Sequence, residues 1–182
     1  MFKKISFVFL MLLSASTLFS CSNKSNVTET KEFPYETKPY YGNLTGDYNL
    51  DFNDMNNYVI DYLNSEAMPF FFVKSNKDGI LSGDNDKKLI TVTCTCTNGT
   101  TVHDLDLFLS MALNGIGYNA SEQDSRFVKP SVGQDGSFTD FGTVFNVYNL
   151  KIDAKDESGN VLRDDYINAT ERIPIDPKYI KE

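Results

Sequence analysis

The spacing of hydrophobic residues predicts an amphipathic helix in the first half of the chain. This helix covers residues 53–65, with Asp51 or Asn53 as its N-cap and Pro69 beyond its end. The apolar side chains fall on one face at three- and four-residue intervals: Phe52, Met55, Val59, Tyr62 and Leu63.

A second amphipathic pattern starts after Thr101. Asp104 follows three residues later, in the position of the acidic partner of a capping box. We expect Asn114–Gly115 and Gly117 to end this helix, because glycine is common just past a helix end. The apolar stripe is longer than that of the first helix: Val102, Leu105, Phe108, Leu109, Ala112 and Ile116.

Four other stretches have the aromatic and β-branched composition of strands. The second of them alternates strictly, with isoleucine, valine and two cysteines on one face and threonines on the other. The third has apolar residues on both faces, which is typical of a central strand. The four predicted strands are residues 70–73, 88–97, 141–154 and 161–167.

The connections between these elements are polar and rich in turn residues. Residues 75–87 predict a wide loop across which the first two strands pair as a hairpin, and residues 156–160 predict a tight turn. Residues 118–140 form an irregular polar stretch. The tail, with Pro174 and Pro177, is expected to be extended and to lie at a sheet edge.

The resulting order is α-β-β-α-β-β, which predicts a single α+β domain. The simplest arrangement is an antiparallel sheet of about four strands with both helices packed against it, since that buries both helical stripes. Residues 47–182 suffice for one hydrophobic core.

The N-terminus has the pattern of an export signal. Lys3 and Lys4 supply positive charge, residues 5–19 are almost entirely apolar or small, and the run ends at Cys21. The tetrapeptide Leu18-Phe19-Ser20-Cys21 resembles the lipobox of bacterial lipoproteins. Phe19 stands where the strictest form of the motif has a small residue, a departure that lipoproteins of spirochaetes and Bacteroidetes tolerate. This resemblance implies cleavage before Cys21, a lipid such as palmitate on the processed N-terminus, and attachment to the cell envelope, with the outer membrane favoured.

Two alternatives to the lipobox stay open. One is a transmembrane helix, for which the apolar run is shorter than the roughly 20 residues that a span needs. The other is an ordinary cleaved signal followed by a chance cysteine.

The domain organisation follows from these patterns. We interpret residues 1–20 as the signal peptide, residues 21–46 as a flexible tether rich in polar residues and proline, and residues 47–182 as the globular domain. The tether also contains aromatic side chains that are candidate partner contacts: Tyr35, Tyr40 and Tyr41.

The charge of the chain excludes one class of partner. The full sequence carries 17 basic and 25 acidic residues, a net charge of −8. Removal of Lys3 and Lys4 with the signal leaves 15 basic against 25 acidic side chains, a net charge of −10. Nucleic-acid binding requires a basic surface, so we expect no nucleic-acid partner.

Cys94 and Cys96 are interpreted as free thiols packed as small apolar residues. Side chains two residues apart on a strand are separated by roughly 6.5–7 Å. A disulfide needs Cβ atoms only about 3.5–4.5 Å apart, so a regular strand keeps this pair unbridged.

No motif indicates catalysis, a metal or a cofactor. The single histidine, His103, lies in the first turn of the second helix, where capping explains its acidic neighbours. The stretch from Lys74 to Asn85 partly resembles a calcium loop, but those two end positions lack the required carboxylates. Asp164 and Asp165 point to opposite faces of a strand, which argues against a catalytic pair.

The sequence therefore favours a non-enzymatic binding or assembly module that is anchored by lipid on Cys21 and serves another envelope or surface protein. In length and lipobox the chain resembles the small lipoproteins that accompany surface proteases of the dentilisin type, which implies an accessory subunit of such a complex. Two alternatives are a surface lipoprotein that binds a ligand or host factor, and a small carboxylate-dependent hydrolase.

Overall fold

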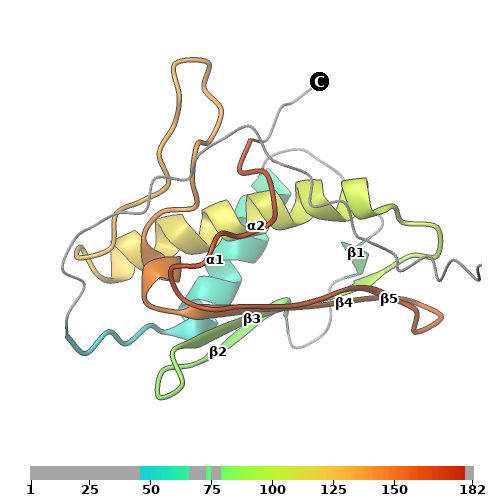
Figure 1. Cartoon of the computed structure of the whole chain (residues 1–182), viewed down its shortest axis with the longest axis horizontal. Helices are drawn as coiled ribbons and strands as arrows, with labels where there is room; N and C mark the ends of the chain where they lie inside the picture. The colour runs from blue at the N-terminus through green and yellow to red at the C-terminus, as the bar shows by residue number, and fades with distance from the viewer. Residues whose placement is uncertain (1–45, 66–72, 75–78, 179–182) are drawn as a thin grey trace, which may run out of the picture. The chain divides into compact units, whose positions relative to one another are not determined.

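Both helices pack on the same side of a β-sheet, and this arrangement is the frame of the domain (Figure 1). The computed structural model describes residues 46–65, 73–74 and 79–178. In these residues the predicted α+β class and the order α-β-β-α-β-β are confirmed, with the first strand position divided between two short strands.

The first helix, α1, spans Phe52–Ser65, close to its predicted bounds. Of the two candidate N-caps, Asp51 takes the role: its Oδ1 accepts hydrogen bonds from the backbone N–H groups of Asn53, at 2.9 Å, and Asp54, at 3.1 Å. The predicted apolar face is buried at Met55, Val59 and Leu63.

The second helix, α2, spans Val102–Gln123, so the predicted end near Gly115 and Gly117 is wrong. Its start is correct, since Thr101 and Asp104 form a complete capping box. The glycines serve close packing. A Cβ on Gly117 would lie 2.2 Å from the carbonyl oxygen of Phe141, and one on Gly115 would lie 3.2 Å from the Tyr62 ring of α1.

Within the described residues the sheet has five strands. β3 pairs with β4 on one edge and with both β1 and β2 on the other, and β5 lies outside β4. β2 falls in the stretch that the sequence predicts as a loop, where it forms a tight hairpin with β3. The strands are β1 (Val73–Lys74), β2 (Leu81–Asp84), β3 (Leu89–Cys96), β4 (Asn149–Asp156) and β5 (Val161–Ile167).

The sheet is antiparallel except between β3 and β4, which pair in parallel from Leu89↔Asn149 to Cys96↔Asp156. The predicted sheet was antiparallel throughout, so this pair is a correction. Its cause is α2, because two parallel neighbours need a long crossover and a helix between two strands provides one.

Two further segments differ from their predicted form. Residues 141–148 precede β4 instead of belonging to it, and they contain the 3-10 helix η1 (Val144–Asn146). The tail does not extend a sheet edge. Ile173 and Ile175 are buried, and the Asn114 side-chain amide of α2 donates to the carbonyl oxygen of Pro177 at 3.4 Å.

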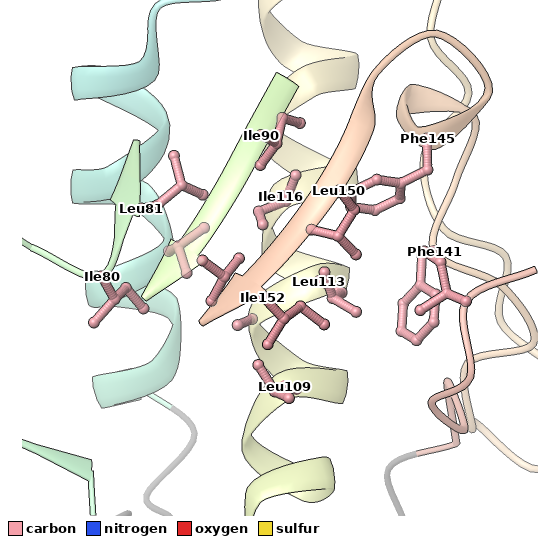
Figure 2. Close-up of a cluster of buried hydrophobic side chains, with 14 of the residues drawn as sticks. Ile80, Leu81, Ile90, Leu109, Leu113, Ile116, Phe141, Phe145, Leu150 and Ile152 are labelled. Atoms are coloured by element: carbon pink, nitrogen blue, oxygen red, sulfur yellow. The ribbon is translucent and has the colours of Figure 1, made fainter. Parts of the chain in front are cut away.

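The hydrophobic core lies between α2 and the two central strands. Figure 2 shows Leu109, Leu113 and Ile116 of α2 near Ile90 of β3 and the β4 side chains, with Phe141 and Phe145 beside them. Every second residue of β3 is buried, as the predicted alternation requires. The predicted strand of residues 70–73 is described only at Val73, since residues 66–72 lie outside the described part.

The close approach at Gly117 generates a prediction about stability. Gly117→Ala should lower the free energy of unfolding by about 1–3 kcal/mol, because the added methyl group collides with backbone at Phe141. This loss outweighs the roughly 1 kcal/mol that alanine ordinarily gains over glycine in a helix. Urea unfolding followed by circular dichroism measures it.

Gly115→Ala is the matched control, two residues earlier on the same helix. Its new methyl group meets only side-chain atoms of Tyr62 and Val59, which can shift, so a change near zero is expected. A Gly117→Ala protein more stable than the parent would contradict the packing argument.

Candidate functional site

The residues predicted to attach the protein or contact a partner lie outside the described part of the chain. These are Cys21 in the lipobox and Tyr35, Tyr40 and Tyr41 in the predicted tether. Their roles stay predictions. The first described residues that follow them are therefore the place where the predicted tether meets the domain.

Residues 47–51, which we name the junction segment, connect the predicted tether to α1. Tyr48 and Leu50 are buried, whereas Asp47, Asn49 and Asp51 are exposed. The segment has no helical or strand partner of its own, so its backbone groups need other partners. Side chains from four distant parts of the chain supply them.

Asn85, in the turn between β2 and β3, holds Leu50 by both backbone groups. Its Oδ1 accepts from the Leu50 N–H and its Nδ2 donates to the Leu50 carbonyl oxygen, each at 3.0 Å. A side-chain amide thus pairs with backbone as a neighbouring strand would. Asn85, the last position of the stretch that partly resembles a calcium loop, thus holds the junction segment.

Tyr148, just before β4, and Lys88, just before β3, both reach the carbonyl oxygen of Tyr48. The Tyr148 hydroxyl lies 2.9 Å from this oxygen and 2.7 Å from Asn85 Oδ1, and its single proton serves one acceptor at a time. The Lys88 ammonium group also donates to Tyr48. Burial raises the pKa of Tyr148 to about 12, so the hydroxyl remains a donor at neutral pH.

Gln123, the last residue of α2, holds Asp51 in the same two-sided way. Its Oε1 accepts from the Asp51 N–H at 2.7 Å and its Nε2 donates to the Asp51 carbonyl oxygen at 3.0 Å. Nε2 also lies 2.6 Å from Asn119 Oδ1, and Asn119 in turn donates to Asp54 of α1. The end of α2 is thereby joined to the start of α1.

Arg126 completes the contacts of the junction segment. Its Nη2 donates to the Asp47 carbonyl oxygen at 3.0 Å, and its guanidinium lies 4.0 Å from the centre of the Tyr48 ring. Asp124 orients it through a pair of hydrogen bonds to Nε and Nη2. The Phe127 ring also packs against Tyr48, with 4.8 Å between the two ring centroids.

These contacts fix the junction segment to the domain without a covalent bond. The junction segment is held by side-chain amides, an ammonium group, a phenol and a guanidinium, none of which is an activated nucleophile. Sequence reasoning missed the site because each contact joins residues far apart in the chain. The available signal was the abundance of Asn in the sequence, together with Gln123 at a helix end.

The predicted chemical groups lie elsewhere and are engaged in local structure. His103 is exposed on the first turn of α2. Hydrogen bonding to Thr101 lowers the pKa of the Asp104 carboxyl group. Asp164 is exposed, whereas Asp165 binds Arg163 at 2.6 Å, so the two aspartates do not share a site.

A partly buried charge cluster joins α2 to β5. Arg163 Nη2 lies 2.8 Å from Asp106 Oδ1, and Arg163 Nη1 lies 2.6 Å from Asp165 Oδ2. Two carboxylates thus share one guanidinium. Burial raises the pKa of Asp106 above its usual value, although the charge of Arg163 acts in the opposite direction.

The two described cysteines are buried and free, as the strand geometry predicts. Burial raises the pKa of both thiols, so neither is ionised at neutral pH. Across the described ranges no group of three or more His, Cys, Asp or Glu side chains could hold a metal ion. No helix in those ranges has the length and apolar character needed to cross a bilayer.

Comparison of the chain with protein-family models, with curated proteins and with solved structures gave no match.

Removal of the Asn85 side chain should release the junction segment. Asn85→Ala leaves both backbone groups of Leu50 without their partner, and a loss of about 2–3 kcal/mol in the free energy of unfolding is expected. Hydrogen exchange should also become faster at the Leu50 N–H. Asn57→Ala, on the exposed face of α1, is the control and should change stability by less than about 0.5 kcal/mol. Equal effects of the two substitutions would refute the role of Asn85.

Substitution of two aspartates on α2 should change the free energy of unfolding with opposite dependence on pH. The raised pKa of Asp106 means that the folded state binds its proton more tightly than the unfolded state does. The ionised form therefore costs stability at pH 7, and the cost is relieved as the pH falls through the raised pKa. Asp106→Asn should gain stability relative to the parent at pH 7, and the gain should shrink on acidification.

Asp104→Asn, two residues away, should have the opposite effect on stability. The lowered pKa of Asp104 contributes stability above the pKa of the unfolded chain, and this contribution is lost as the pH falls. The variant should be less stable than the parent at pH 7 and approach it in acid. Urea titrations between about pH 2 and 7 measure both, since the Asp104 contribution is lost below the unfolded-chain pKa and the Asp106 cost is relieved above it. Parallel curves for the two variants would contradict the assignment.

Proposed function

We propose that the protein is a lipid-anchored envelope protein that works as a non-enzymatic binding or assembly module for another envelope or surface protein. The anchor is the lipid on Cys21, and the tether of residues 21–46 leads from it to the domain. An accessory subunit that stabilises a surface protease complex is one specific form of this proposal.

The observation that carries the proposal is the attachment of the junction segment. When a domain is attached through its N-terminus, a force applied to the tether acts first on residues 47–51. Four distant parts of the chain bind this segment by hydrogen bonds: the β2–β3 turn, the end of α2, the loop after α2 and the residue before β4. Such a connection supports an attached body that transmits load to its core.

A partner surface is available on the sheet. Both helices lie on one side of it (Figure 1), and no described helix or strand covers the other side. That side carries polar and mixed-charge residues that remain partly exposed, together with Tyr166, which is 57% exposed. Its other members include Thr91, Thr93, Thr95, Lys151 and Asp153.

The anchor is tested first. In a bacterial host that processes lipoproteins, the full chain should fractionate with membranes, and mass spectrometry should find a diacyl-modified N-terminal Cys21. Cys21→Ser should remove the lipid and release the protein from the membrane fraction. Cys94→Ala, which changes a buried thiol, should keep the lipid. An unmodified Cys21 thiol in the parent protein would refute the anchor.

The partner is tested on the same material by purification from a detergent extract. The parent should bring down a neighbouring protein in stoichiometric amount. Thr93→Lys places a new charge at the centre of the uncovered sheet face and should weaken this association about tenfold or more. Asn57→Lys, on the exposed face of α1, should leave it intact. Recovery of the lipidated chain alone, or equal loss with both variants, would refute the assembly function.

A further inference from the structure

Asn98 and Gly99 lie in the exposed turn between β3 and α2. Gly99 has a φ of +88°, and a Cβ built on it would meet nothing within 4 Å. In an Asn–Gly pair the glycine nitrogen reaches the asparagine side-chain carbon more easily than in other pairs, because glycine lacks a Cβ and rotates freely. Rotation of this turn displaces no core residue.

A second residue, distant in sequence, acts on the same asparagine. Ser158, in the turn between β4 and β5, donates a hydrogen bond from its hydroxyl to Asn98 Oδ1 at 3.0 Å. Attack by the Gly99 nitrogen on Asn98 Cγ would place negative charge on this oxygen. A donor aimed at the atom where charge develops stabilises the transition state.

We propose that Asn98 is a site of spontaneous intramolecular deamidation, assisted by the Ser158 hydroxyl. The Gly99 nitrogen loses its proton to solvent and forms a bond to Asn98 Cγ. The bond from Cγ to the side-chain nitrogen then breaks, and ammonia leaves with a proton from water. The resulting succinimide ring is opened by one water molecule, which gives aspartate or isoaspartate at position 98.

The chain contains a built-in comparison. Asn114–Gly115 is its other Asn–Gly pair, in the interior of α2. Asn114 is fully buried, its side-chain amide donates to the Pro177 carbonyl oxygen, and the helix fixes the backbone. The required rotation there would break the helix, so the fold should protect this asparagine.

The change at position 98 has a physical consequence for the fold. It adds one negative charge three residues before the N-cap of α2, near the positive end of the helix dipole. Isoaspartate also lengthens the backbone between β3 and α2 by one atom. The reaction therefore alters the end of the sheet where this turn meets the β4–β5 turn, whether or not the chain carries a lipid.

The test follows the full-length protein by peptide mapping and mass spectrometry during incubation at pH 6, 7 and 8. Product in which the Asn98 side-chain amide has become a carboxylic acid should accumulate. Its rate of formation should rise with pH, because the nucleophile is the deprotonated backbone nitrogen. Asn114 should stay unmodified in the folded protein and react once the chain is unfolded in urea. Chromatography should separate aspartate and isoaspartate peptides from the Asn98 site.

Ser158→Ala tests the assisting hydroxyl, and as an exposed turn substitution it should leave the fold intact. It should slow the reaction at Asn98 about fivefold, the rate equivalent of one ordinary hydrogen bond. Intact Asn98 after prolonged incubation at pH 8, or equal reaction at Asn98 and Asn114 in the folded protein, would overturn the site. An unchanged or faster rate in Ser158→Ala would overturn the assistance.

Discussion

The parallel pairing of β3 with β4 is the constraint on which the rest of the structure depends. Two parallel neighbours oblige the chain to cross the sheet between them, and α2 makes that crossing. Because α2 then lies over the centre of the sheet, it is buried on most sides, and α1 can pack only against α2 and the β2 edge. The close contacts follow from this crowding, since the backbone at Phe141 approaches α2 at Gly117 and side chains of α1 approach it at Gly115.

Side-chain amides supply backbone hydrogen bonds at places where no neighbouring strand or helix supplies them. Asn85 and Gln123 each pair with both backbone groups of one residue in the junction segment, and Asn56 of α1 accepts from the N–H groups of Ile80 and Leu81. An amide carries a donor and an acceptor side by side, as a peptide group does, so it can continue a ladder at a point where no strand is available. The abundance of asparagine in this sequence has a structural explanation at these positions.

Local patterns predicted the parts of the fold that depend on local physics. The caps at Asp51 and Thr101, the alternation of β3 and the turn before β5 all involve residues close in sequence, and each was predictable. The end of α2 was not, because the role of Gly117 depends on Phe141, far along the chain. The junction contacts were missed for the same reason. From the sequence Asn85 is predicted as a turn residue, and its contact with Leu50 forms only when the chain folds.

The terminal strand β5 carries charged residues on both of its faces. β5 pairs with β4 on one side only, and the outer side of such a strand is a template on which another chain can add. Arg163 and Asp165 point toward α2, and Asp164 is exposed on the opposite face, so an added strand would have to cover consecutive charged residues and remove them from water. These charges therefore disfavour the addition of a second copy of the protein along this edge of the sheet.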